Sequence, residues 1–432
     1  MSQATIAIII ILFAIISFAL EKIPLPVTAM LAALAMGIFK IIPFSDIYSG
    51  FSNTSVMMVA GMLVIGNCIF ESGLATWLGE RLSTLPIVKN ERCFLFFMVL
   101  FSAALSAFLS NSAVVAVCIP LVGSLVLKSE GRLTNKNIIM GIGMASAIGG
   151  SCTMVGSTAQ LAAQQVLEAT EGCRPLEFFE LSYVCGPLCL ILAIYFATFG
   201  YHLEKKYFTF EDVNVLATVS EEKMSWENGQ TFTWKMGASG IVMILCILGF
   251  IMNVWNVAVI ALTGATILLL IGCMDFKKAM RIMDWNTIII LGAVQGFAKG
   301  LDASGGGRML AEWILSIFGG QNASPFVLLT ICVILSTVLT NFMSNTAVLA
   351  MLTPIFINIG FQIGIQPEPF ILACIIGGST ALATPIGTPS VTQTLVAGYR
   401  FIDYVKIGLP ITIILTIGCM ILCPLVYGFT PL

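Results

Sequence analysis

The sequence predicts an all-α polytopic membrane protein made of two inverted-topology repeats, with about ten transmembrane helices, two re-entrant hairpins and two broken helices. Its residues are 58% hydrophobic and 10% charged, whereas an average soluble protein domain is about 25% charged. Apolar runs of 17 or more residues recur along the chain, and a helix needs about 20 residues to cross a bilayer. One polar motif also occurs twice, once in each half.

The repeated motif lies inside the two longest uncharged runs. FLSNSAVVAVCIP (108–120) returns 234 residues later as FMSNTAVLAMLTP (342–354), with seven of thirteen positions identical. The first run, 93–127, has 35 residues, whereas two complete spans need about 40 residues plus a turn. We therefore expect re-entrant hairpins at 93–127 and about 325–358, with the motif at their tips. Two short complete spans in place of each hairpin are the alternative.

The other apolar runs complete two matching halves. Residues 1–201 hold three spans, the first hairpin, a broken span and a final span, and residues 234–432 repeat this order after a polar linker at 202–233. Because each half crosses the membrane an odd number of times, the second repeat is inverted. The predicted spans are 4–20, 26–43, 55–75, 137–167 (broken), 181–201, 234–252, 255–274, 286–300, 367–398 (broken) and 406–428.

The basic residues are divided unequally between the two sides of this map. Sixteen of the twenty Lys and Arg fall in one set of loops, and only Lys40, Arg174, Lys299 and Arg308 fall in the other. Cytoplasmic loops are the ones enriched in Lys and Arg. We therefore expect both termini outside and the linker in the cytoplasm, with the first hairpin open to the cytoplasm and the second open to the outside.

Glycines and prolines interrupt both broken spans near their centres. IGGSCTMVGST (148–158) resembles IGGSTALATPIGTP (376–389). A broken helix exposes carbonyl groups that suit a cation and N–H groups that suit an anion. Paired apolar segments interrupted by Gly or Pro, in inverted repeats, indicate a secondary transporter whose site lies near the bilayer midplane. They argue against a simple channel or a structural membrane protein.

Polar side chains of the two tips and two breaks form a candidate site. Ser106 and Ser110 are four residues apart, so they face one side of a helical arm and offer neutral oxygens to a hard monovalent cation. Together with Asn111, they have counterparts in the second hairpin at Thr340, Ser344 and Asn345. Amide and hydroxyl donors for a substrate come from Asn111, Ser112, Thr153, Asn345, Thr346 and Thr384. The alternative is that these groups only hydrogen-bond neighbouring helices.

These four segments contain no Arg or Lys. A carboxylate bound there would be held by neutral donors, helix ends and a bound cation. A helix terminus contributes roughly 0.3–2 kcal/mol, whereas a cation about 5 Å from the anion contributes roughly 3 kcal/mol at an effective dielectric near 20. We therefore expect an anionic substrate to bind together with its cation.

Other polar residues indicate other roles. The Ser-Asn-Thr sequence at 52–54 opens a span, where Ser or Asn is predicted to cap the helix. Glu71, Lys299 and Asp302 lie near span ends, where snorkelling or an interfacial ion pair is expected and a proton relay is the alternative. An intramembrane enzyme would need a general base, and the single histidine, His202, lies at a span end. We expect neither enzymatic activity nor a nucleic-acid partner.

The paired tips, the GGSCTMVGST break and the stretch TPIGTPSVTQTLVAGYRFIDYVKIGLP (384–410) resemble the divalent anion/sodium symporter family over nearly the whole chain. The members of that family carry dicarboxylates, citrate, tartrate or sulfate. The resemblance implies a homodimeric elevator-type transporter of the cell membrane that couples sodium to C4-dicarboxylates such as succinate, malate or fumarate. The alternatives are a sodium-independent antiporter of dicarboxylate, tartrate or citrate, and a carrier of sulfate or another anion.

The resemblance also implies where ions and substrate bind. It places one sodium ion at Ser106, Ser110, Asn111 and the neighbourhood of Cys152, and a second at Thr340, Ser344, Asn345 and Ala383. It places the substrate between the tips, at Asn111, Ser112, Thr153, Asn345, Thr346, Thr384 and Pro385. Gln160 and Val391 stand where the family usually has Asn. Sodium is thus expected as a coupling ion and not as a prosthetic group.

Overall fold

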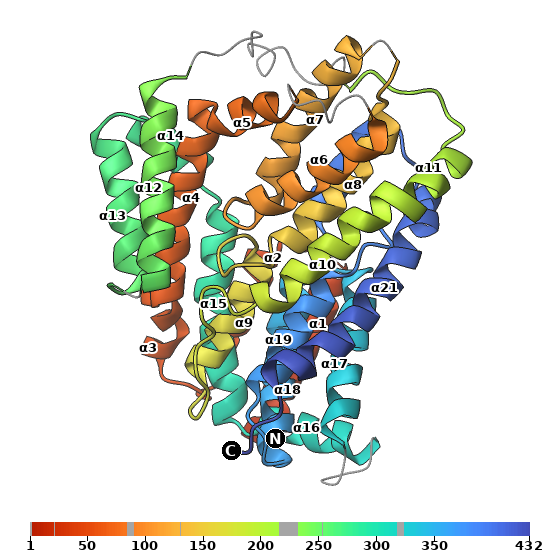
Figure 1. The fold of residues 1–432 in the computed structure, drawn as a ribbon. Coiled ribbons are helices and arrows are strands. Elements are labelled where there is room, and N and C mark those ends of the chain that lie inside the picture. The colour runs from red at the N-terminus through yellow and green to blue at the C-terminus, as the bar shows by residue number, and fades with distance from the viewer. Residues whose placement is uncertain are drawn as a thin grey trace.

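The computed structural model describes residues 2–20, 22–83, 90–129, 131–215, 232–252, 254–317 and 324–432. Within these ranges every regular element is helical, apart from one isolated antiparallel bridge between Ile365 and Pro431. The prediction of an all-α polytopic fold is confirmed, and six of the described helices are long and apolar enough to cross a membrane. Figure 1 shows both termini at the same, lower end of the molecule.

The helices follow one another in the same order in both halves of the chain. The first half contains α1 (Gln3–Leu20), α2 (Leu25–Ile38), α3 (Phe44–Ile47), η1 (Ser49–Ser52), α4 (Thr54–Ser72), α5 (Leu74–Ser83), α6 (Glu91–Ser106), α7 (Asn111–Lys128), α8 (Asn135–Gly149), α9 (Thr158–Ala169), α10 (Ser182–Tyr195), η3 (Phe196–Gly200) and α11 (Tyr201–Tyr207). The second half contains α12 (Trp234–Met252), α13 (Val257–Leu270), α14 (Phe276–Ile282), α15 (Trp285–Ala303), α16 (Gly306–Ile317), α17 (Pro325–Thr340), α18 (Asn345–Gln362), α19 (Glu368–Ser379), α20 (Pro389–Gln393), η7 (Thr394–Ala397) and α21 (Phe401–Tyr427).

Two features differ from the predicted spans. The short helices α5, α14 and α16 fall where charged residues interrupt the apolar runs, so hydropathy alone predicted loops there. The last span of the first half continues through the π-helical turn η3 into α11, past its predicted end at residue 201. It therefore enters the predicted linker, whose residues 216–231 lie outside the described part of the chain.

Helices of the two halves pack across one another to form one side of the molecule. α4 lies against α13, and α2 lies against α15. Small residues allow these close contacts between membrane helices. A Cβ atom at Gly61 of α4 would lie 2.6 Å from the carbonyl carbon of Ala261 in α13, and one at Gly300 of α15 would lie 2.6 Å from Cγ of Met36 in α2.

The hairpins and the broken helices form the other side. α6 and α7 are joined by the first tip (107–110), and α6 packs on α8, which is separated from α9 by the first break (150–157). In the second half, α17 and α18 are joined by the second tip (341–344), and α17 packs on α19, which is followed by the second break (380–388). α18 also packs on α9, and α7 on α20, so each hairpin contacts the broken helix of the other half.

The two hairpins open at opposite ends of the molecule. The open ends of α6 and α7 lie at the upper end in Figure 1, whereas the second hairpin opens at the end that holds the termini. At the open end of the first hairpin, Glu91 begins α6 and accepts hydrogen bonds from the N–H (2.9 Å) and hydroxyl (2.7 Å) of Thr134, which precedes α8. The assignment of the upper end to the cytoplasm remains a prediction from the loop charges.

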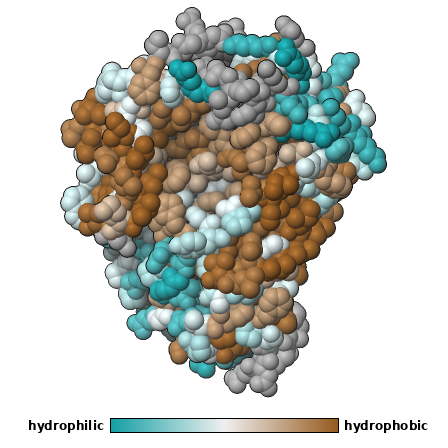
Figure 2. Space-filling view, in the orientation of Figure 1, coloured by the Kyte–Doolittle hydropathy of each residue, from teal (hydrophilic) through white to brown (hydrophobic). Residues whose placement is uncertain are grey.

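The outer surface has the polarity expected of a membrane protein. Figure 2 shows hydrophobic surface on two opposite flanks and hydrophilic residues gathered towards the ends. The exposed apolar side chains of one flank belong to α12 and include Ile241, Ile244 and Leu248, and those of α21 include Ile413 and Ile417. These flanks are the surfaces that would face lipid.

Charged and capping residues near the helix ends behave as the sequence predicted. Asn53 caps α4, because its Oδ1 accepts a hydrogen bond from the N–H of Ser55 at 2.7 Å. Glu71 forms an ion pair with Lys278. Nζ of Lys299 lies 3.5 Å from a carboxylate oxygen of Asp46. The expected helix cap and the expected ion pairs of Glu71 and Lys299 are thus confirmed.

The contact between α4 and α13 generates a test of the packing. Substituting Gly61→Ala should lower the free energy of unfolding by about 1–3 kcal/mol, because the new methyl group overpacks a helix interface. Gly186→Ala in α10 is the matched control, since nothing lies within 4 Å of its Cβ position. Thermal unfolding of both variants in detergent is the measurement, and equal midpoints would contradict the close approach.

Candidate functional site

The first tip places its polar groups against the end of α8. Ser106 is fully buried, and its hydroxyl lies 2.7 Å from Oδ1 of Asn111 and 2.9 Å from both the carbonyl and the hydroxyl oxygen of Ser146. Ser146 also donates to the carbonyl oxygen of Asn111 at 2.9 Å. Ser110 is the N-cap of α7 and accepts a hydrogen bond from the N–H of Ala113 at 3.4 Å. Ser146 thus joins the residues named from sequence.

The second tip repeats this arrangement with fewer hydrogen bonds. The hydroxyl of Thr340 lies 3.4 Å from Oδ1 of Asn345. Ser344 is the N-cap of α18, and its side chain makes no capping hydrogen bond. Asn341 accepts from the N–H of Ala383 at 3.1 Å and donates to the carbonyl oxygen of Thr337 at 2.8 Å. The second tip is therefore anchored through Asn341.

Each break is fastened to its tip by a threonine. The hydroxyl of Thr153 donates to the carbonyl oxygen of Ala107, and that of Thr384 donates to the carbonyl oxygen of Asn341 at 2.5 Å. Both threonines are buried. The structure therefore brings Thr153 and Thr384 to the two tips, and both hydroxyl hydrogens are directed at backbone carbonyls.

Glycine is required where the breaks approach the tips. A Cβ atom at Gly387 would lie 1.8 Å from the carbonyl oxygen of Thr340, and one at Gly150 would lie 1.9 Å from Oδ1 of Asn111. No side chain larger than hydrogen fits at such distances. Gly150 of the first GGS sequence and Gly387 of the GTP element, predicted to interrupt the helices, thus also allow the contact between break and tip.

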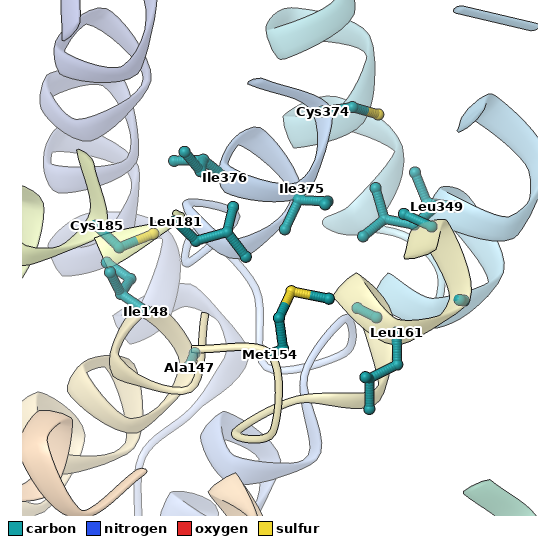
Figure 3. Packing of buried hydrophobic residues seen from close by; sticks show 14 of the residues in the cluster. Ala147, Ile148, Met154, Leu161, Leu181, Cys185, Leu349, Cys374, Ile375 and Ile376 are labelled. Carbon is teal, nitrogen blue, oxygen red and sulfur yellow. The ribbon is translucent and has the colours of Figure 1, made fainter. Parts of the chain in front are cut away.

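The first break meets the end of α19 and the start of α18 inside the molecule. The hydroxyls of Ser151 and Ser379, which occupy matching positions in the GGS sequences, hydrogen-bond to each other. The hydroxyls of Thr158 and Thr346 lie 2.7 Å apart and connect α9 to the start of α18. Apolar side chains surround these polar contacts, and Figure 3 shows Met154 of the first break pointing toward α19.

The remaining predicted residues lie in the same region. Ser112 and Thr346 are the second residues of α7 and α18. Pro385 is buried in the second break, and its carbonyl oxygen accepts a hydrogen bond from Thr392. The thiol of Cys152 in the first break lies 3.8 Å from that of Cys189 in α10.

The helix ends at the tips and breaks give the site its electrostatic character. α7 and α18 begin at Asn111 and Asn345, and the N-terminus of a helix carries a positive partial charge that favours anions. α8 and α19 end at the breaks, where their carbonyl groups favour cations. Within the described residues, no group of three or more His, Cys, Asp or Glu could hold a metal ion. The candidate ligands are therefore neutral oxygens.

Cavities lie between α4 and this region. A cavity of 30 Å³ is lined by Gly66 and Asn67 of α4 and by Phe108, Leu109 and Ser110 of the first tip. A larger cavity of 460 Å³ lies near the start of α4 and is lined by Ser55, Met154 and Glu168, among others. Together they follow one face of α4 from its first turn to the tip.

Sequence reasoning did not include several residues of the site. Ser146, Ser151 and Ser379 are single hydroxyls in Gly-rich apolar segments, and only their partners in space distinguish them. Asn67 carries a sequence signal, because it is an amide in the middle of a span. From the sequence, Gln160 is distinguished only by standing where the family usually has Asn. The structure shows its amide group hydrogen-bonded to two carbonyl oxygens of the first break.

The model of the citrate transporter family matches residues 15–377, more than half of the chain. The chain belongs to the citrate transporter family. This agrees with the resemblance read from the tips and breaks, and it makes the protein a membrane transporter and not an enzyme.

Two similar proteins are transporters that match most of this chain. An uncharacterized transporter of Methanocaldococcus jannaschii is 26% identical over 91% of this chain and 87% of its own. The sodium-dependent dicarboxylate transporter SdcS of Staphylococcus saprophyticus is 22% identical over 85% of this chain and 75% of its own.

Two solved structures share the fold. The YdaH transporter of Alcanivorax borkumensis superimposes with a TM-score of 0.65 over 88% of this chain and 87% of its own, at 17% sequence identity. MtrF of Neisseria gonorrhoeae gives a TM-score of 0.61 over 98% of this chain and 95% of its own, at 14% identity. At these identities the likeness concerns the fold alone.

The hydrogen bond between Ser151 and Ser379 generates a second prediction. Ser151→Ala and Ser379→Ala should each destabilise this transporter, but the double variant should lose less than the sum, because both single changes remove the same hydrogen bond. A coupling energy of about 0.6 kcal/mol, and at most about 1.7, is expected for such a bond between membrane helices. Thermal unfolding of the four proteins measures it, and strictly additive losses would show that the serines do not interact.

Proposed function

We propose that this member of the citrate transporter family is a sodium-coupled symporter of C4-dicarboxylates such as succinate, malate and fumarate. The observation that supports this most directly is the pair of matched tips, each placing an Asn and a hydroxyl at the start of a buried helix. The name of the sodium-dependent dicarboxylate transporter SdcS, to which the chain is similar, points in the same direction.

Two matched anion sites fit an anion with two carboxylates. Asn111 and Ser112 begin α7, and Asn345 and Thr346 begin α18. In each pair, the side-chain donors and the free N–H groups of the first helical turn are available to one carboxylate. Thr153, Thr384 and Pro385 would line the same space from the breaks, as the resemblance implies. Each half would then hold one end of the substrate.

Sodium would supply the positive charge that these ligands lack. A cation about 5 Å from a carboxylate contributes roughly 3 kcal/mol at an effective dielectric near 20, more than the roughly 0.3–2 kcal/mol of a helix terminus. The candidate sodium ligands form the two sets already named. The first set is Ser106, Ser110, Asn111 and Cys152, and the second set is Thr340, Ser344, Asn345 and Ala383. Substrate affinity would therefore depend on bound sodium.

Transport would proceed by an elevator movement in a homodimer of the plasma membrane. The hairpins and broken helices would move as one body along the group formed by α2, α4, α13 and α15. The cavities beside α4 lie at the boundary between these two groups and would be one path to the site. The two inverted repeats, the cytoplasmic linker and the external termini complete this proposal.

Uptake into proteoliposomes tests the function. Labelled succinate is offered with an inward sodium gradient or in sodium-free choline buffer, with and without succinate inside. Uptake that needs sodium and no internal succinate is the expected result. Uptake that needs internal succinate and ignores sodium would replace the symporter with an exchanger of dicarboxylate, tartrate or citrate. If succinate does not enter in any condition, citrate, tartrate and sulfate are offered next, and uptake of sulfate alone would contradict a dicarboxylate carrier.

The tip asparagines generate a third prediction. Asn111→Ala and Asn345→Ala should each reduce succinate uptake at least tenfold, because each removes an amide that would bind substrate, while the protein stays folded in the membrane. Asn358→Ala is the matched control, since this Asn lies on α18 away from the tip and bonds to the carbonyl oxygen of Pro354. Normal uptake by both tip variants would contradict the site.

A further inference from the structure

The two halves treat the carbonyl oxygens of their breaks differently. The GST (156–158) and GTP (387–389) elements align Cys152 with Ala383, Thr153 with Thr384, and Gln160 with Val391. Five oxygens per half can therefore be compared position by position. They are the side-chain oxygens of Ser106, Ser110 and Asn111 with the carbonyl oxygens of Cys152 and Thr153, and the corresponding oxygens of Thr340, Ser344, Asn345, Ala383 and Thr384. The comparison shows which half has oxygens left for a cation.

In the first break, side chains donate to the carbonyl oxygens. Nε2 of Gln160, a fully buried residue of α9, lies 2.8 Å from the carbonyl oxygen of Gly150 and 2.7 Å from that of Thr153. The hydroxyl of Ser182 donates to the carbonyl oxygen of Cys152. Because an amide carries two hydrogens, one Gln160 side chain satisfies two backbone groups.

In the second break, the Thr392 hydroxyl donates to the carbonyl oxygen of Pro385, but the side chains near Ala383 accept from N–H groups. Asn341 accepts from Ala383, and the hydroxyl of Thr412 accepts from the N–H of Leu382 at 3.0 Å. Val391, at the position of Gln160, has no donor. The carbonyl oxygens of Ala383 and Thr384 are in buried residues and accept no hydrogen bond from any residue that the structure describes. Buried carbonyl groups without a partner are unfavourable.

The tips show the same difference. In the first tip, the Ser106 hydroxyl lies within 2.9 Å of three oxygens and donates its one hydrogen to one of them, and the Ser110 hydroxyl accepts from the N–H of Ala113. In the second tip, the Ser344 hydroxyl makes no hydrogen bond among the described residues, and the 3.4 Å between the Thr340 hydroxyl and Oδ1 of Asn345 is long for two oxygens. Cys374 stands where the first half has Ser146, so the hydroxyl that completes the first network is missing from the second.

We propose that the chain binds one hard monovalent cation, in its second half, and that the Gln160 amide takes the place of a cation in the first half. The cation lies between the second tip and the second break, with oxygens of Thr340, Ser344, Asn345, Ala383 and Thr384 as candidate ligands. The carbonyl oxygens of Gly150, Cys152 and Thr153 in the first half already accept hydrogen bonds, and the positively polarised NH2 group of Gln160 repels a cation. The inference rests on the proposed function only in taking sodium as the ion.

Equilibrium binding of radioactive sodium to the purified protein tests this proposal without substrate or transport. The assay is made in detergent at constant ionic strength, with choline chloride replacing sodium chloride. One sodium ion per wild-type chain is expected. Asn111→Ala should keep that ion, and Asn345→Ala should lose it. Thermal unfolding in the same buffers gives a second readout, in which sodium raises the midpoint of the wild type and of Asn111→Ala but not of Asn345→Ala.

Gln160→Met tests the role of the amide itself. The side chain keeps its length but has no donor, so the carbonyl oxygens of Gly150 and Thr153 become available and the count should rise to two. Val391→Gln makes the reciprocal change and should lower the count to zero. If Gln160→Met does not fold, the two asparagine variants still decide where the ion binds.

The outcomes separate this inference from the proposed function. Two sodium ions in the wild type, or loss of binding in Asn111→Ala, would overturn the inference even if succinate uptake needs sodium. Absence of sodium binding in the wild type would also overturn the inference, and would indicate that water molecules hydrogen-bond to the carbonyl oxygens of the second break. A count that stays at one in Gln160→Met would remove Gln160 from the explanation. Absence of dicarboxylate uptake would contradict the proposed function alone and leave a count of one unaffected.

Discussion

The architecture depends on one constraint, which is that backbone polar groups inside a membrane protein must find partners within the protein. α8 and α19 both end in the interior, and the breaks that follow leave N–H and C=O groups without helical partners. The hairpin tips lie against these breaks and supply many of the missing partners. Thr153 and Thr384, each donating to its tip, are the clearest examples.

Glycine makes these hydrogen bonds between break and tip possible, since break and tip are closer than any side chain allows. The contact between Gly387 and the Thr340 carbonyl is the tightest of these approaches. The hydrogen bond between Ser151 and Ser379 then joins the first break to the end of α19. Because most of these polar groups contact a group from another segment, the tips, breaks and surrounding helices form one interdependent unit. An unsatisfied group in such a unit is a place where a ligand belongs.

The two halves share an order of helices but differ in chemistry. Gln160 and Ser146 in the first half occupy the positions equivalent to Val391 and Cys374 in the second half. These side-chain differences decide which oxygens are already hydrogen-bonded. Under the proposal of a single cation, changes at these two positions would give the two halves different ion requirements. The same reasoning explains why similarity to the citrate transporter family establishes a transporter, while the ion and the substrate depend on individual side chains.

The sequence by itself determined the all-α membrane fold, the positions of the long helices, the family and the residues of both tips. Hydropathy and internal repetition are properties of composition and order, so they can be read without coordinates. It did not determine the short helices α5, α14 and α16, because their charges interrupt the apolar runs. Only the tertiary structure decided that Gln160 donates to two carbonyls of the first break, and that the carbonyl oxygens of Ala383 and Thr384 accept no hydrogen bond from the described residues. Hydrogen bonds between distant segments depend on distances that the order of residues does not contain.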